Sequence, residues 1–179
     1  MSEYKHQKKE VLYTSNFLNL VEEDIELPTG IVVQRLTVEH SGAVVVIPIL
    51  DSGHMVMVKQ YRHAVQTHLL EFPAGTLEQG ETPLECAKRE LAEEIGQEAA
   101  IWKDLGQLHP APGFCNEVHH VFIASSLSPV ESNPDEDEIL EIFDITPAEF
   151  DDMILRGQIT DAKSIALFYK AAVHIKHQS

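Results

Sequence analysis

The stretch Gly80–Gly96, GETPLECAKRELAEEIG, predicts a helix whose two ends are both marked in the sequence. Thr82 suits the N-cap and Pro83 the first helical position, where a missing N–H costs nothing. Glu85 stands where a capping box places its carboxylate, and Gly96 is a typical helix stop. Four apolar residues recur at spacings of three and four and predict one stripe that faces the core: Leu84, Ala87, Leu91 and Ile95.

Three glutamates of this helix, Glu90, Glu93 and Glu94, lie within about one turn, and we expect this carboxylate patch to project away from most of the apolar stripe. Like charges at this spacing repel each other, and the nearest cation is Arg89, which can reach Glu85 or Glu93. A hard divalent cation such as Mg²⁺ would satisfy the remaining charge. The alternative is a solvated helix face, which is the common meaning of an acidic run.

The composition indicates one well-packed domain, with room for a small appendage, because the chain has 179 residues of which 44% are hydrophobic. The 29 acidic residues against 13 basic ones disfavour nucleic acid and anionic membranes as partners. No apolar run approaches the length of a membrane span, and the first ten residues lack the apolar core of a signal peptide. Cys86 and Cys115 form no CxxC pair, which suits a reducing cytoplasm.

The remainder of the chain predicts a mixed sheet with helices on its faces, α/β or α+β in class. Two β-rich runs flank Pro28-Thr29-Gly30 and predict an N-terminal β-hairpin. Residues Ala43–Leu50 are nearly all apolar and predict a strand buried on both faces. Further strands are expected at His54–Arg62, Val118–Ala124 and Glu138–Ile145, with two helices at Thr146–Gly157 and Asp161–Ile175.

The spacing around the acidic helix carries a resemblance to a known family. Eight positions at fixed gaps agree with the Nudix box, the signature of the Nudix hydrolases: Gly75, Glu81, Arg89, Glu90, Leu91, Glu93, Glu94 and Gly96. One position departs, because the family usually has an aliphatic residue where this chain has Gln97. We expect a local repacking there rather than loss of the chemistry.

The resemblance extends beyond the box. Val58–Glu81 and Pro112 are similar to the branch that hydrolyses ADP-ribose and related nucleoside diphosphate sugars. This implies the Nudix fold, an α/β/α sandwich around a mixed central sheet, over residues 41–179. It also implies that residues 1–40 form a small β-hairpin domain, exchanged between the two halves of a homodimer.

The family further implies a metal site and a base. Glu90 and Glu94 match the family's metal-ligating glutamates, and the backbone carbonyl of Ala74 matches a further ligand of this branch. Glu93 is a second-line ligand, or a direct ligand when several ions are bound, while Arg89 and Glu81 support the carboxylates. These roles imply Mg²⁺, with Mn²⁺ as the alternative ion. In this branch the base lies on a loop outside the box.

The loop that matches this chain is SNPDEDEI, residues 132–139. Glu136 is our candidate for the base, with Glu138 as an extra metal ligand, although the register between these two could be the reverse. Glu136, Glu93 and Arg89 are therefore the candidate catalytic residues. Solvent-facing acidic residues in a turn are the alternative interpretation.

Three residues are candidates for substrate binding. Arg62 could meet a phosphate, with a structural salt bridge as the alternative. Glu117 could accept a hydrogen bond from a ribose hydroxyl, or it could be a surface glutamate, and Pro112 marks the branch. Aromatic residues available to stack on adenine are Tyr13, Phe17 and Phe114.

The resemblance thus implies a cytoplasmic, homodimeric, Mg²⁺-dependent hydrolase that splits ADP-ribose into AMP and ribose 5-phosphate. The first alternative is a hydrolase of other nucleoside diphosphate sugars, such as GDP-mannose. The second is a Nudix-fold module that binds a sugar nucleotide without cleaving it, which the complete set of box glutamates argues against.

Overall fold

The computed structural model describes residues 3–131 and 139–176. The chain divides into two compact units, Met1–Gly42 with His109–Val118 and Ala43–Leu108 with His119–Ser179. The sequence-based division into 1–40 and 41–179 placed 109–118 in the larger domain. In the structure this segment pairs with strand β3 (Val32–His40), because the Val38 N–H donates to Phe114 O and the Asn116 N–H donates to Val38 O.

The N-terminal unit is a three-stranded antiparallel sheet in the order β1–β2–β3 rather than a two-stranded hairpin. The expected hairpin is confirmed between β2 (Leu18–Glu26) and β3. Its turn is closed by the Gly30 N–H, which donates to Leu27 O, and Gly30 adopts a φ of 84° that favours glycine. The third strand, β1 (Lys5–Thr14), was not predicted, and all ten of its residues are exposed.

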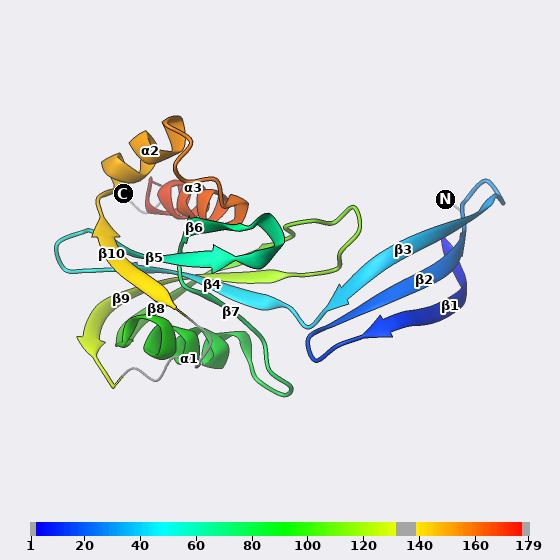
Figure 1. The fold of residues 1–179 in the computed structure, drawn as a ribbon, viewed down its shortest axis with the longest axis horizontal. Coiled ribbons are helices and arrows are strands. Elements are labelled where there is room, and N and C mark those ends of the chain that lie inside the picture. Colours follow the sequence, from blue (N-terminus) through cyan, green and yellow to red (C-terminus); the bar gives the residue numbers. More distant parts are fainter. Residues whose placement is uncertain (1–2, 132–138, 177–179) are drawn as a thin grey trace. The chain divides into compact units, whose positions relative to one another are not determined.

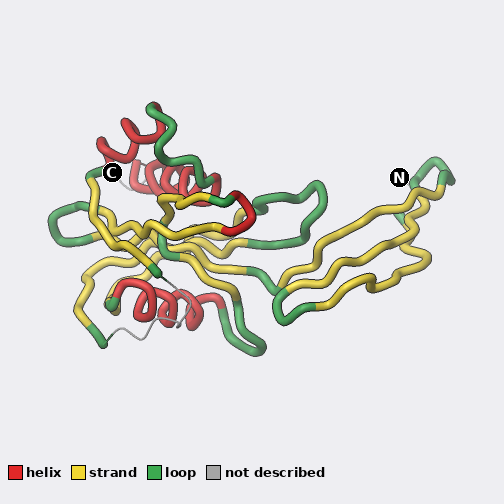
Figure 2. Tube along the Cα trace, in the orientation of Figure 1, coloured by secondary structure: helices red, strands yellow, loops and turns green. Residues whose placement is uncertain are grey.

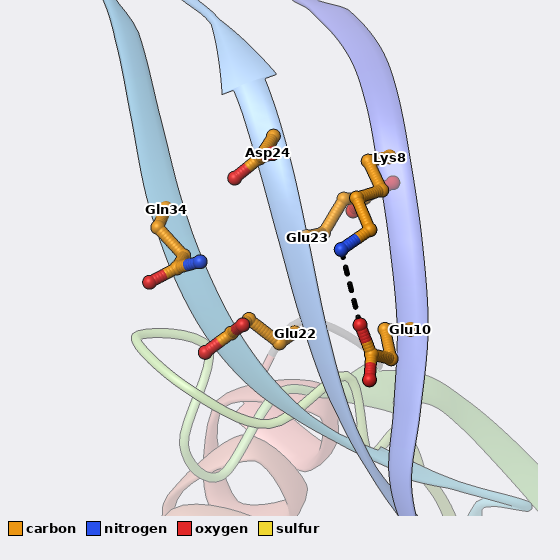
Figure 3. Close-up of a pocket in the computed structure, with 6 residues that line it drawn as sticks. All are labelled: Lys8, Glu10, Glu22, Glu23, Asp24 and Gln34. Carbon is orange, nitrogen blue, oxygen red and sulfur yellow. Dashed lines mark hydrogen bonds and ion pairs between the residues drawn. The ribbon is translucent and has the colours of Figure 1, made fainter.

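One face of this sheet carries a shallow acidic hollow (Figure 3). It is lined by Lys8, Glu10, Glu22, Glu23, Asp24 and Gln34. Lys8 Nζ donates to Glu10 Oε2 at 3.1 Å, and this hydrogen bond, with the charges of Glu10, Asp24 and Glu22, raises the pKa of Lys8. The hollow therefore contains its own cation.

The second unit contains a seven-stranded mixed sheet (Figure 1). Its strands are β4 (Ala43–Ile49), β5 (Met55–Arg62), β6 (Thr67–Glu71), β7 (Ala74–Thr76), β8 (Gln97–Leu108), β9 (His119–Pro129) and β10 (Leu140–Ile145). The main order is β10–β5–β4–β9–β8, with β6 paired to β5 and β7 paired to β4. Among the described residues of this sheet, β4–β9 is the one parallel strand pair. A short 3-10 turn, His63–Val65, separates β5 from β6.

Helices cover both faces of this sheet, which confirms the α/β/α sandwich (Figures 1 and 2). The helices are α1 (Pro83–Ile95), α2 (Pro147–Leu155) and α3 (Ala162–Lys176). Strand β4 is buried on both faces, as predicted. Val44 and Val46 pack in the cluster formed with α1, whereas Val45 and Ile47 pack in the cluster formed with α2 and α3. This alternation follows from the two-residue period of a strand.

Both predicted capping boxes are present. The Glu85 N–H donates to Thr82 Oγ1 at 3.4 Å, and Glu85 Oε2 accepts from the Thr82 N–H at 2.9 Å. Thr146 and Glu149 repeat this arrangement at the start of α2. At the other end of α1, Gly96 caps the helix with a φ of 63°. Within the described residues, the structure contains no helix with the length and apolarity needed to span a membrane.

Candidate active site

Helix α1 buries three of its four predicted apolar residues, Ala87, Leu91 and Ile95. Leu84 is exposed, whereas Glu90 and Glu94 are buried, with exposed fractions of 7% and 3%. Glu90 and Glu94 are therefore not part of a solvated helix face, which was the alternative interpretation of the acidic run. Both carboxylates are covered because the chain after β6 continues as β7, which pairs with β4 in the sheet and contacts α1.

Gly75 makes this close approach possible. A Cβ atom built on Gly75 would lie well under 3.0 Å from Oε1 of Glu90, a separation that real Cβ atoms do not adopt. The requirement for glycine here is therefore a requirement for space, since the backbone of β7 lies directly against the Glu90 carboxylate.

Glu94 is held by the same strand. Its Oε2 accepts a hydrogen bond from the Ala74 N–H at 3.1 Å. Ala74 and Gly75 thus bring backbone against two carboxylates that stand one helical turn apart. The structure supports the predicted meeting of Ala74, Glu90 and Glu94, while the role of the Ala74 carbonyl as a metal ligand stays a prediction.

Arg89 lies at the centre of a carboxylate network. Its Nε and Nη2 donate to the two oxygens of Glu81 at 2.9 and 3.0 Å, and its Nη1 donates to Glu90 at 2.7 Å and to Glu93 at 2.9 Å. Nη2 also reaches the carbonyl of Thr76 at 3.2 Å. The hydrogen bond from Arg89 lowers the pKa of Glu81 to about 2, and the carboxylates in turn raise the pKa of Arg89. Arg89 orients the carboxylates, as the sequence predicts for it.

The donor set fits a hard divalent cation. One guanidinium serves Glu81, Glu90 and Glu93, so the buried carboxylates of α1 carry more negative charge than Arg89 can offset. Oxygen atoms of carboxylates and carbonyls are the ligands that Mg²⁺ prefers. Within residues 3–131 and 139–176, no three His, Cys, Asp or Glu side chains are arranged to hold a metal ion by themselves. Glu138, the third predicted side-chain ligand, lies outside this range, as does Glu136.

Arg62 takes part in a second charged cluster. Its Nε donates to Glu71 Oε1 at 2.8 Å and its Nη2 donates to Glu71 Oε2 at 2.6 Å. This is the salt bridge that the sequence left open as the alternative to phosphate contact. Burial would by itself raise the pKa of Glu71, but the hydrogen bonds and charges of Arg62 and Lys163 outweigh it and lower this pKa. Neither Glu71 nor Lys163 was predicted, although a glutamate inside the apolar run LLEF was the available signal.

The other two candidate substrate residues belong to the N-terminal unit. Pro112 and the exposed Phe114 line a concavity of about 300 Å³. Glu117 Oε1 lies 3.6 Å from His40 Nδ1. Tyr13 and Phe17 are also exposed in this unit. Their contacts with a substrate stay predictions.

A family model for the NUDIX domain matches residues 39–168 of this chain, a span that contains the whole α1 site. The chain belongs to the Nudix family. This confirms the resemblance inferred from the box, and the buried pair Glu90 and Glu94 lies within the matched span.

Curated relatives of this Nudix protein carry several names. It is 38% identical over 164 residues to the ADP-ribose pyrophosphatase of Bacillus subtilis, covering 90% of this chain and 89% of the relative. It is 39% identical over 170 residues to the ADP-ribose pyrophosphatase of Mycobacterium tuberculosis, covering 92% and 80%. A protein of Bacillus methanolicus named methanol dehydrogenase activator is 38% identical over 165 residues, covering 91% and 89%.

The fold also has a close match among solved structures. A crystal structure of an ADP compounds hydrolase superposes with a TM-score of 0.85 at 24% sequence identity, covering 100% of this chain and 97% of that one. This similarity supports the Nudix fold.

Proposed function

We propose that this Nudix hydrolase cleaves the pyrophosphate bridge of ADP-ribose, giving AMP and ribose 5-phosphate, with Mg²⁺ as the metal and Mn²⁺ as a possible substitute. The observation that carries the proposal is the pair of buried carboxylates, Glu90 and Glu94, packed against the backbone of Ala74 and Gly75. Two relatives named ADP-ribose pyrophosphatase support the choice of substrate.

Glu90, Glu94 and the Ala74 carbonyl would hold the metal, with Glu138 as an additional ligand. The bound ion would offset phosphate charge and lower the pKa of a water molecule. Arg89 holds the carboxylate of Glu90 in place, which keeps the site organised before substrate arrives. Glu93 remains a second-line ligand.

In the reaction a water oxygen forms a bond to one phosphorus while the bond from that phosphorus to the bridging oxygen breaks. The water proton passes to a carboxylate, for which Glu136 is our candidate, and the leaving phosphate departs as a phosphomonoester. Arg62 contacts a phosphate oxygen of the substrate in this proposal. The charge of Glu94 acts on its guanidinium, and Arg62 is hydrogen-bonded to Glu71 rather than to a carboxylate of the box.

A second candidate is the hydrolysis of other nucleoside diphosphate sugars. A relative in Yersinia enterocolitica named GDP-mannose pyrophosphatase is 29% identical over 143 residues, covering 75% of this chain and 74% of the relative. The metal-binding carboxylates and Arg89 would serve both reactions equally. The choice therefore depends on the part of the pocket that recognises the base and sugar.

A third candidate, a module that binds sugar nucleotides without cleaving them, has less support. Burying Glu90 and Glu94 together costs free energy. A binding module that uses no metal would gain nothing to offset this cost. The buried pair therefore favours a metal-dependent hydrolase over such a module.

The test is a substrate panel. Purified protein with Mg²⁺ is offered ADP-ribose, GDP-mannose, UDP-glucose and NADH in parallel, and the released phosphomonoester is measured after phosphatase treatment. We expect ADP-ribose to be cleaved fastest. Preferential cleavage of GDP-mannose would favour the second candidate, and no cleavage with either Mg²⁺ or Mn²⁺ would contradict the proposal.

We also propose a homodimer in the cytoplasm. The N-terminal sheet supports the dimer, because β1 is exposed along its whole length and carries apolar side chains such as Val11 and Tyr13. The free cysteines Cys86 and Cys115 support a reducing compartment.

A further inference from the structure

Glu71 is a buried carboxylate that the box does not include. Its exposed fraction is 1%, and it lies at the end of β6, between the partly buried Leu70 and the buried Phe72. An ionised carboxylate is tolerated at such a place only when it is paired and hydrogen-bonded. Arg62 supplies a two-pronged pair of hydrogen bonds at 2.8 and 2.6 Å, which fixes the plane of the guanidinium.

A second cation completes the pairing. Lys163, near the start of α3, also donates to Glu71 Oε2, and it lies 3.1 Å from Asp161 Oδ1. Asp161 Oδ2 accepts from the Ser164 hydroxyl at 2.6 Å. Two carboxylates and two cations therefore form a balanced cluster that joins β5 and β6 to α3.

Arg62 is the most exposed member of the cluster. Its side chain is 38% exposed, whereas those of Glu71, Lys163 and Asp161 are 1%, 14% and 12% exposed. Both nitrogens that face Glu71 are used, and the remaining one, Nη1, has no hydrogen-bond acceptor among the described residues. The charge of Glu94 also acts on this guanidinium. Nε and Nη2 of Arg62 are thus held by Glu71, whereas Nη1 can bind a further group. The guanidinium is close enough to Glu94 for their charges to interact.

The Glu71–Arg62 pair is linked to the carboxylate site of Glu94 by a short stretch of backbone. Glu71 is followed by Phe72, whose N–H donates to Ser164 Oγ at 2.8 Å, and then by Pro73 and Ala74, whose N–H donates to Glu94. Only Phe72 and Pro73 therefore separate Glu71, which holds Arg62, from Ala74, which holds Glu94.

We propose that Glu71 is a positioning residue: it holds the Arg62 guanidinium so that its free edge binds the pyrophosphate of the substrate beside Glu94. Glu71 itself does not touch the substrate. The inference rests on the proposed function and deepens it, because it assigns the orientation of Arg62 to an unpredicted buried carboxylate.

The experiment compares Glu71→Gln, Arg62→Lys and the double variant with wild type, using ADP-ribose and Mg²⁺. We expect each single variant to raise KM roughly 10- to 100-fold, the usual loss for a charge-assisted hydrogen bond, with a smaller change in kcat. We expect the KM of the double variant to be no higher than that of the single variant with the larger KM, because both changes remove the same contact.

The matched control is Glu141→Gln, which removes another carboxylate paired with a cation of β5, the 2.9 Å contact to Lys59. We expect its KM to equal that of wild type. If Glu71→Gln does not fold, Glu71→Asp keeps the charge while withdrawing the oxygens by one methylene, and the same rise in KM is expected.

A lower unfolding temperature with unchanged KM in the soluble Glu71 variant would overturn the inference, as would additive effects in the double variant. If wild type cleaves no sugar nucleotide, the proposed function fails separately. Calorimetric binding of magnesium pyrophosphate then decides: weaker binding in both single variants supports the positioning role, and unchanged binding refutes it.

Discussion

At the scale of single residues, Glu94 has two properties that a solvated helix face lacks. It is 3% exposed, and it accepts a hydrogen bond from the Ala74 N–H. The sequence identifies Glu94 through the spacing of the box, but the helix pattern does not indicate that Glu94 is buried. Helical periodicity describes which side chains share a face, whereas the cover over that face comes from β7, a strand of three residues.

Gly75 allows a test of how closely the backbone must approach the Glu90 carboxylate. We expect Gly75→Ala to lower both stability and kcat, because the new Cβ would displace the Glu90 carboxylate. Gly53→Ala is the control: Gly53 has a φ of 81° but open space around it. Its strain should lower the unfolding temperature and leave kcat unchanged. Equal kcat for Gly75→Ala and wild type would show that Glu90 does not need its present position.

Glu81 gives a prediction about pH. Its pKa is lowered on folding from 4.5 to about 2, so it stabilises the folded state above pH 4.5 and this contribution is lost as the pH falls towards 2. The gap in unfolding temperature between wild type and Glu81→Gln should therefore narrow as the pH is lowered through this window. Thermal unfolding followed by circular dichroism in EDTA measures it, with the exposed Glu98→Gln as control. A gap independent of pH would contradict the pairing with Arg89.

At the scale of elements, the predictions succeed where the signals are local. The caps of α1 and α2 depend on side chains three residues apart, and both capping boxes form as expected. Strand β4 is recognisable because a continuous apolar run has to be covered on both faces.

The unpredicted elements depend on partners distant in the sequence. Strand β1 has no apolar alternation, and its pairing with β2 makes it a strand. Strand β8 lies at the edge of its sheet, with Leu105 its one buried residue, and it is defined by its ladder to β9. The Glu71 cluster was not foreseen for the same reason, since Glu71 and Lys163 are 92 residues apart.

The capping boxes give a prediction at this scale. We expect Thr82→Ala and Thr146→Ala each to lower the free energy of unfolding by about 1 kcal/mol, because each removes an N-cap. Urea titrations measure both values. Helix α1 contributes carboxylates to the proposed site and α2 contributes none, so a reduction in kcat should accompany Thr82→Ala and not Thr146→Ala. The reverse result would mean that α2 contributes to the chemistry.

At the scale of the whole molecule, the N-terminal unit exposes several large apolar side chains. Its exposed apolar residues include Val11, Tyr13, Ile31, Val32 and Leu36. A sheet of three strands with no helix in its unit leaves both of its faces without cover from its own elements. In the homodimer that we propose, a second copy of the chain covers part of this surface.

We expect light scattering after size-exclusion chromatography to give twice the mass of one chain. Val11→Glu should shift the protein towards monomer, because it places a charge on the exposed apolar strand, while Tyr169→Glu on the exposed face of α3 should not. A monomeric wild type at micromolar concentration with full activity would contradict the dimer.

The most direct measurement is the release of AMP from ADP-ribose as a function of Mg²⁺ concentration, for wild type and for Glu94→Gln. The carboxylate site predicts saturable dependence on Mg²⁺ in wild type and a loss of orders of magnitude in kcat for the variant, with Mg²⁺ raising the unfolding temperature of wild type alone. Release of AMP in EDTA, or equal rates for the two proteins, would contradict a metal site at Glu90 and Glu94.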